Sequence, residues 1–297
     1  MPPACCTPRA LPAISPVTEG THGEPAASPA GTGRRLLVTR PAPQAAAWVA
    51  TLRASGIDAE ALPLIAIAPP LDRQAVPAEW RRLAQRLLLV FVSPAAVERF
   101  FDVRPDGVPW PQQLTVAAPG PGTRGALLAR GVPAASIIEP AADAAQLDSE
   151  SLWQQLRQRS WHDASALVVR GDGGREWLAE RLAAAGARVD FVGAYRREPV
   201  DLDPAARRLL LGALARPARH AWLLSSSESV GRLRPASDLS DAALRLQLGS
   251  ATAVATHPRI AERAVEAGFG RVVVSHPTLP AVVACLQSMT AAESLST

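Results

Sequence analysis

Residues 63–70 read Pro-Leu-Ile-Ala-Ile-Ala-Pro-Pro, an extended stretch bounded by proline and without a helical period. Residues 193–199 read Gly-Ala-Tyr-Arg-Arg-Glu-Pro and have the same character. Both segments interrupt an otherwise regular alternation of strand and helix patterns, so we interpret them as connectors. A chain that crosses twice between two lobes carries one of them as an insertion. We therefore expect a lobe at 70–193, inserted into a lobe formed by 34–64 plus 198–290.

Outside the connectors, short aliphatic runs alternate with helical patterns such as 174–185, and glycine follows several of those patterns. This alternation predicts an α/β fold of two flavodoxin-like lobes, each a parallel sheet flanked by helices, with a cleft between them. Ligands in such folds bind at the carboxyl ends of strands. The candidate strands are 36–39, 59–62, 87–93, 114–118, 136–138, 166–170, 188–192, 221–225, 252–255 and 271–275.

The composition excludes several chemistries. All 31 basic residues are arginine, because the 297-residue chain contains no lysine, and the net charge is +4. Without lysine, neither a Schiff-base enzyme nor a phosphate loop ending in Gly-Lys is possible. Arginine suits fixed recognition of carboxylate or phosphate, although a GC-rich genome produces the same bias. The arginines do not cluster with aromatic residues, so we expect no nucleic-acid partner.

The sequence also disfavours a membrane-spanning, a metal-binding or a disulfide-bonded protein. No apolar run is longer than the six residues of 87–92, which are too few to cross a membrane. The histidines and the three cysteines show neither metal-ligand spacing nor a disulfide framework, so we expect no metal site and a cytoplasmic location. Residues 1–33 have almost no large apolar side chains, and we expect a disordered extension there and a short tail at 291–297.

A glycine motif at 120–125, Gly-Pro-Gly-Thr-Arg-Gly, matches G-x-G-x-x-G after a strand pattern, with Glu139 at the distance of a ribose-binding acid. Three interpretations are open: a strand-to-helix turn, a dinucleotide site, or a site for the acidic group of another ligand. Pro119 and Pro121 remove backbone donors where a pyrophosphate needs them.

A second glycine-rich turn, residues 170–175, follows another strand pattern. Its glycines allow a ligand close to the backbone and its arginines are suited to carboxylates, but a tight turn with solvated arginines explains the pattern equally well. The residues concerned are Arg170, Gly171, Gly173, Gly174 and Arg175.

Hydroxyl groups follow several other strand patterns, at Ser93, Thr123, Ser225 and Ser226. Each is also a good helix N-cap. Tyr195, the only tyrosine, lies in the second connector, where it is either a ligand contact or an amphipathic residue packed on one lobe.

Taken in order, these segments resemble the uroporphyrinogen-III synthase family from about Arg34 to Leu286. The matching stretches are Leu36-Leu-Val-Thr-Arg-Pro41 with Gln44, Pro63-Leu-Ile-Ala-Ile, Phe91-Val-Ser-Pro-Ala-Ala-Val, Val116-Ala-Ala-Pro-Gly-Pro-Gly-Thr123, Asp148-Ser-Glu-Ser-Leu, Arg170-Gly-Asp-Gly-Gly-Arg-Glu and Val192-Gly-Ala-Tyr-Arg-Arg197.

The resemblance implies a hydro-lyase that closes the linear tetrapyrrole hydroxymethylbilane, with loss of water and inversion of ring D through a spiro intermediate. It implies no metal or organic cofactor, a substrate handed over by hydroxymethylbilane synthase, and a monomer. The enzyme must fold a flexible polyacid so that the correct ring carbon attacks, which is positional control.

The resemblance also implies roles for residues of this chain. Tyr195 matches a tyrosine placed near the departing hydroxyl, which makes it the expected general acid, since a phenol keeps its proton at neutral pH. Ser93, Thr123, Ser225, Ser226, Arg170 and Arg175, with the glycines between the two arginines, are the expected substrate contacts. At 255–259 the chain departs from the family pattern, and either Thr256 or His257 takes that contact. Two rival functions are a dinucleotide-dependent oxidoreductase using 120–125 and a non-catalytic, two-lobed ligand-binding module.

Overall fold

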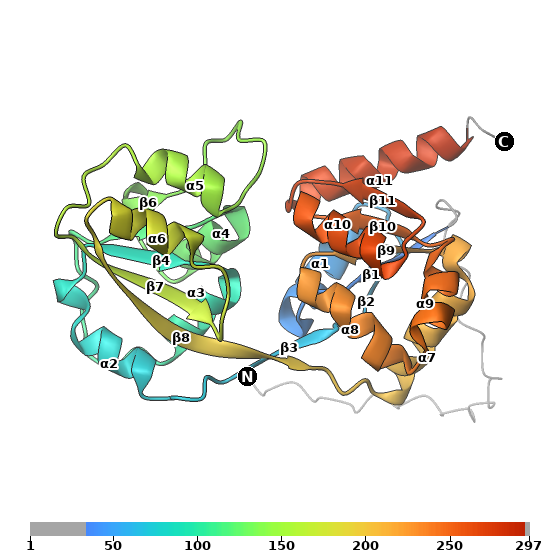
Figure 1. Cartoon of the computed structure of the whole chain (residues 1–297), viewed down its shortest axis with the longest axis horizontal. Helices are drawn as coiled ribbons and strands as arrows, with labels where there is room; N and C mark the ends of the chain where they lie inside the picture. The colour runs from blue at the N-terminus through green and yellow to red at the C-terminus, as the bar shows by residue number, and fades with distance from the viewer. Residues whose placement is uncertain (1–33, 295–297) are drawn as a thin grey trace, which may run out of the picture. The chain divides into compact units, whose positions relative to one another are not determined.

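The computed structural model describes residues 34–294, in which eleven strands form two separate sheets (Figure 1). The expected extension at 1–33 lies outside the described residues. At the other end, helix α11 (Leu279–Ser294) continues into the segment for which we expected a tail.

The first sheet is entirely parallel, with strand order β11-β10-β9-β1-β2. In chain order this is 2-1-3-4-5, the flavodoxin-like arrangement. Helices α1 and α11 pack against one face, and α7, α8, α9 and α10 against the other (Figure 1). The bounds are β1 (Arg35–Val38), α1 (Ala42–Ala54), β2 (Ala59–Ala61), α7 (Pro204–Ala215), β9 (His220–Leu224), α8 (Ser227–Ser237), α9 (Asp241–Leu248), β10 (Thr252–Ala255), α10 (Pro258–Ala267) and β11 (Arg271–Val274).

The second sheet has the order β3-β8-β7-β4-β5-β6, parallel except for β3. Its parallel part runs 3-2-1-4-5 in chain order, so its strand order differs from that of the first sheet. One face carries α2, α3 and α4, and the other carries α5 and α6. The bounds are β3 (Ile65–Ala68), α2 (Ala75–Arg81), β4 (Leu88–Phe91), α3 (Pro94–Asp102), β5 (Thr115–Ala117), α4 (Pro121–Ala129), β6 (Ile137–Ile138), α5 (Ser149–Leu156), β7 (Ser165–Gly171), α6 (Trp177–Ala184) and β8 (Arg188–Pro199), with 3-10 turns at Leu83–Gln85, Ala134–Ser136 and Pro217–Arg219.

The predicted class, two α/β lobes built on parallel sheets, is confirmed. Nine of the ten expected strands lie within two residues of their predicted ends, because each is a short run rich in apolar residues between turn signals. The lobe boundaries at 34–64, 70–193 and 198–290 stay a prediction, which the strand membership of the two sheets supports.

The connectors differ from the expectation in one respect. Residues 193–199 are not a separate segment but the second half of the twelve-residue strand β8. Residues 188–195 of β8 pair with β7, and residues 196–199 pair antiparallel with β3, the first connector. The two connectors therefore satisfy much of each other's backbone hydrogen bonding, which an isolated extended segment leaves to water.

A buried ion pair anchors β8 near its start. The Arg86 guanidinium is 2.7 Å from Glu79 of α2, donates to Ser165 of β7 at 2.9 Å and pairs with Asp190 of β8. Because Arg86 and Glu79 are both buried, removing either one would deprive the other of its buried counter-ion, leaving Arg86 with Asp190 and Glu79 with Arg82, whose side chains are exposed. The cluster ties three elements together at the end of the sheet opposite the strand-end residues described below.

Candidate functional site

Tyr195 lies on β8 and is almost fully buried, with 1% of its surface exposed. Its hydroxyl is 3.0 Å from Ser93 Oγ and accepts a hydrogen bond from Arg197 Nη2 at 3.1 Å. Ser93 is the N-cap of α3, where its Oγ also accepts the Ala96 N–H at 3.2 Å. The phenol is thus held between a serine at the end of β4 and an arginine of the connecting part of β8.

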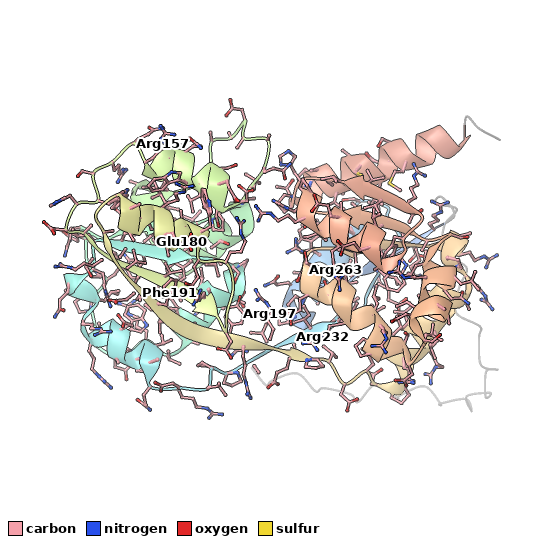
Figure 2. All side chains as sticks on the ribbon, in the orientation of Figure 1. Arg157, Glu180, Phe191, Arg197, Arg232 and Arg263 are labelled. Carbon is pink, nitrogen blue, oxygen red and sulfur yellow. The ribbon has the colours of Figure 1, made fainter. Side chains whose placement is uncertain are left out.

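A β-bulge sets the direction of Tyr195. Arg170 of β7 pairs with Gly193, but the next residue, Gly171, pairs with Tyr195, so β8 carries one extra residue at this point. With uninterrupted alternation Tyr195 would share a face with Phe191, which faces α6; the bulge turns it to the face that α2, α3 and α4 cover. Figure 2 labels Phe191 and Arg197, which lie on the two parts of β8 flanking this irregularity.

Gly171 provides the space for the phenol ring. A Cβ at this position would lie 2.8 Å from Tyr195 Cε2, closer than side chains tolerate. Gly173 and Gly174 have φ of +72° and +123°, so the turn from β7 to α6 requires glycine for its backbone conformation. The structure therefore requires glycine at these three positions for reasons that are independent of any ligand.

Arg170 and Arg175 point away from Tyr195. The Arg170 guanidinium stacks over Phe191 at 4.0 Å and bonds to Glu176 at 2.9 Å, while its Nη1 is buried without a partner among residues 34–294. Arg175 pairs with Glu150 of α5 at 2.7 Å. Both arginines thus belong to the face that α5 and α6 cover.

A cavity of about 390 Å³ lies on that face. Its apolar lining comes from strand ends and α6, and its polar rim combines residues of α5 and its cap with residues of α8 and α10. The apolar set includes Val90, Val92, Val168, Leu178 and Phe191, and the polar set is Asp148, Ser149, Arg175, Ser227, His257 and Arg259. An apolar floor beneath charged groups is suited to an organic polyanion.

Two carboxylates, Asp148 on this rim and Glu150 two residues further on in α5, contact basic side chains of the rim. His257 Nε2 lies 3.3 Å from Asp148, and Arg175 and Arg259 share Glu150. Burial opposes ionisation of Asp148, but hydrogen bonds from the Ser151 backbone and His257 outweigh it and lower the pKa of this carboxyl. Burial likewise opposes ionisation of Glu150, and the bond from Arg175 leads the effects that lower its pKa. Both acids are therefore charged at neutral pH.

The candidates in the first lobe fall into capping and buried positions. Ser226 caps α8 through the Glu228 N–H at 3.1 Å, and the Ser225 Oγ is buried with no partner among residues 34–294. His257 caps α10 through the Arg259 N–H at 3.1 Å and reaches the cavity, whereas Thr256 is buried beside it and does not line the cavity. Between the two open candidates, His257 is the one that faces the cavity.

The expected site residues thus do not all converge. The second sheet separates Ser93 and Tyr195, on one face, from Arg170 and Arg175 on the other, and Thr123 is buried in the first turn of α4. Sequence reasoning assigned no role to Arg40, Asp148, Glu150, Arg197 or Arg259. Each lies in or beside a segment that carries the family resemblance. Its possible role becomes visible only through a partner far away in the chain, which the spacing of residues along the sequence does not reveal.

The G-x-G-x-x-G motif is a strand-to-helix turn. Gly120 is the extended N-cap of α4, and none of the three glycines has a positive φ or lacks room for a Cβ. Glu139, the candidate ribose acid, pairs with Arg124 at 2.8 Å. No dinucleotide interpretation is supported by this geometry.

Residues 34–294 contain neither a metal-ligand cluster nor a membrane-spanning helix. No cluster of three or more His, Cys, Asp or Glu side chains has a metal-binding arrangement there. Within the same range, every helix is too short or too polar to cross a bilayer.

Two lobes built on parallel sheets, with polar groups gathered at the strand ends, place this chain in the class of two-lobed α/β proteins. The chain belongs to the uroporphyrinogen-III synthase family, since the family model "Uroporphyrinogen-III synthase HemD" matches residues 46–284.

Curated relatives agree with the family assignment. The uroporphyrinogen-III synthase of Salmonella typhimurium is 34% identical over 166 residues, covering 54% of this chain and 64% of that protein. The Escherichia coli enzyme is 31% identical over 171 residues, covering 57% and 68%. The matched region thus spans slightly less than two thirds of the Salmonella protein.

Solved structures support the fold. A mutant uroporphyrinogen III synthase from Thermus thermophilus has a TM-score of 0.55 at 21% identity, covering 88% of this chain and 99% of that one. The Helicobacter pylori enzyme has a TM-score of 0.50 at 14% identity, covering 86% and 99%.

Proposed function

We propose that this protein is a uroporphyrinogen-III synthase. It cyclises hydroxymethylbilane with loss of water and inversion of ring D, as a hydro-lyase in the biosynthesis of haem, sirohaem and cobalamin. The observation that carries this proposal is the buried phenol of Tyr195, hydrogen-bonded to Ser93 and Arg197 at the strand ends of a protein in this family. The substrate comes from hydroxymethylbilane synthase, and the protein acts as a cytoplasmic monomer that uses neither metal nor organic cofactor.

The departing hydroxyl requires a proton, and Tyr195 is the group proposed to supply it. Because Tyr195 is buried and Ser93 is partly exposed, the proton passes from the phenol to Ser93 Oγ while the Ser93 proton passes to the departing hydroxyl, which leaves as water. Arg197 Nη2 already donates to the phenol oxygen and stabilises the negative charge that develops there. The proton returns to Tyr195 when the macrocycle loses a proton on closure.

Substrate binding is assigned to the cavity rim and the strand ends. The substrate carries eight carboxylates, and Arg175 and Arg259 currently share the single carboxylate of Glu150. A substrate carboxylate that replaces Glu150 keeps these cations paired, and Arg170 Nη1 gains the partner it lacks. The apolar floor around Phe191 and Val168 accepts pyrrole rings.

The test is a product-isomer assay. Purified protein receives freshly prepared hydroxymethylbilane, the products are oxidised, and the uroporphyrin isomers are separated by chromatography. We expect isomer III, whereas a sample without protein gives isomer I by spontaneous closure. Isomer I alone in the presence of folded protein would refute the proposed function.

A further inference from the structure

Arg40, two residues beyond β1, is a cation for which residues 34–294 supply no counter-charge. Its guanidinium stacks over Trp48 of α1 at 3.9 Å. Its Nε is buried with no hydrogen-bond partner, and no acidic side chain among residues 34–294 pairs with it. The stacking covers one face of the guanidinium but satisfies none of its N–H donors.

Arg35, at the other end of the same strand, is paired with acidic side chains, as an arginine usually is. It pairs with Asp58 at 3.0 Å and Glu60 at 2.8 Å on the surface. The bond to Asp58 leads the effects that raise the pKa of Arg35, whereas burial alone lowers the pKa of Arg40 to about 10. Arg40 is half-buried, and a partly buried cation that lacks a partner costs stability, so its presence requires another reason.

Ser225 and Arg40 occupy neighbouring positions just beyond the paired strands β9 and β1. Val38 of β1 pairs with Leu223 of β9, and Arg40 and Ser225 each follow two residues later. The Thr39 hydroxyl, one residue beyond the pairing, still bonds to the Leu223 carbonyl at 2.8 Å, so the two strands stay together at this point. The Ser225 Oγ is also buried without a partner among residues 34–294.

The position of this pair within the fold is one where ligands bind. In the order 2-1-3-4-5 the connections leave in opposite directions between β1 and β9, which makes their carboxyl ends the switch point of the sheet. Unpaired buried donors at such a point indicate an acceptor that the chain itself does not provide.

We propose that Arg40 and Ser225 form a carboxylate-binding subsite at the switch point of the first sheet, separate from the cavity that Arg175 and Arg259 line. Arg40 donates through Nε and one Nη to a carboxylate, and Ser225 donates its O–H to the same group. This inference rests on the proposed function, since the polycarboxylate substrate supplies the ligand. Anchoring the substrate in each lobe would restrict which ring carbon can attack.

The test compares Arg40→Met with Arg35→Met, a control at the opposite end of the same strand. Binding of uroporphyrinogen III, kept reduced under anaerobic conditions, is measured by calorimetry, and each unliganded protein is melted. We expect Arg40→Met to raise Kd at least tenfold while melting at or above the wild-type temperature, because a partly buried, unpaired charge is removed. Arg35→Met should bind within about twofold of the wild type.

Two further variants distinguish loss of the subsite from a folding defect. Arg40→Lys keeps the charge but loses the planar fork, and Ser225→Ala removes the second donor; each should raise Kd about threefold or more. Unchanged affinity in Arg40→Met would overturn the subsite, and so would a melting temperature several degrees lower without loss of affinity. In either case, formation of isomer III by the wild type would still support the proposed function. A wild type that neither forms isomer III nor binds uroporphyrinogen III would refute both.

Discussion

Tyr195 is held by three neighbouring residues that each fix a different property of the phenol. Gly171 leaves room for the ring, Ser93 fixes the position of the hydroxyl, and Arg197 supplies a positive charge beside its oxygen. Arg197 is itself 3.8 Å from Glu228 of α8, which Arg232 also contacts. The hydroxyl can therefore be removed or disturbed separately from the ring that packs in the core.

Tyr195→Phe should lower kcat more than tenfold, because the general acid is lost while the ring still packs against Gly171. Steady-state kinetics with hydroxymethylbilane and a thermal melt followed by circular dichroism measure the two effects. Activity close to that of the wild type would remove the assigned role of Tyr195.

Arg197→Gln should lower kcat about tenfold with little change in KM, because it removes the donor to the phenol oxygen and leaves the cavity intact. Arg197→Lys should recover part of the loss. The matched control is Arg196→Gln, which breaks only the neighbouring pair with Glu198 at 2.8 Å. Equal kcat values in the two glutamine variants would show that Arg197 does not act through Tyr195.

The pairing of β7 with β8 determines which side chains reach each face of the second sheet. Up to Arg170 the two strands alternate regularly, and the bulge then reverses the facing of Tyr195. Because β8 continues into its pairing with β3, the bulge lies between two hydrogen-bonded stretches that limit its movement. Any change that shifts this register should move the phenol rather than unfold the lobe.

Gly171→Ala should reduce kcat at least tenfold and destabilise the protein by roughly 1–3 kcal/mol, since the added methyl group overlaps the Tyr195 ring. The control is Gly125→Ala in α4, where a Cβ meets nothing within 4 Å; it should keep full activity and gain about 0.5–1 kcal/mol. Chemical denaturation and kinetics of both variants provide the measurement. A Gly171→Ala enzyme with normal kcat would mean that the position of the ring is unimportant for turnover.

Side-chain contacts at the N-terminal ends of α5 and α10 connect parts of the chain that belong to different sheets. Asp148 contacts His257, and Glu150 contacts Arg259 as well as Arg175. Both carboxyls have lowered pKa values, so they stabilise the folded protein fully above their unfolded pKa of about 4. This contribution is lost as the pH falls through the lower folded values. Solvent weakens the effect at Glu150, which is about one third exposed.

Acidification should therefore destabilise the wild type more than the double variant Asp148→Asn/Glu150→Gln. Melting temperatures measured between pH 6 and pH 3 should fall more steeply for the wild type, and the difference should develop below about pH 4. Glu139→Gln, which removes only the exposed pair with Arg124, is the control and should follow the wild type. Parallel pH profiles for the wild type and the double variant would show that these pairs add no stability.

The sequence by itself determined the class of fold and most strand positions, because short buried runs between glycine and proline signals are local properties. It also indicated strand ends as the place for polar groups. Tertiary structure alone decided that the bulge turns Tyr195 away from Phe191, that a sheet separates Ser93 from Arg175, and that Arg40 finds no counter-charge within the part of the chain that the structure describes. These features depend on strand register and on partners far apart in the chain, which a pattern of neighbouring residues does not encode.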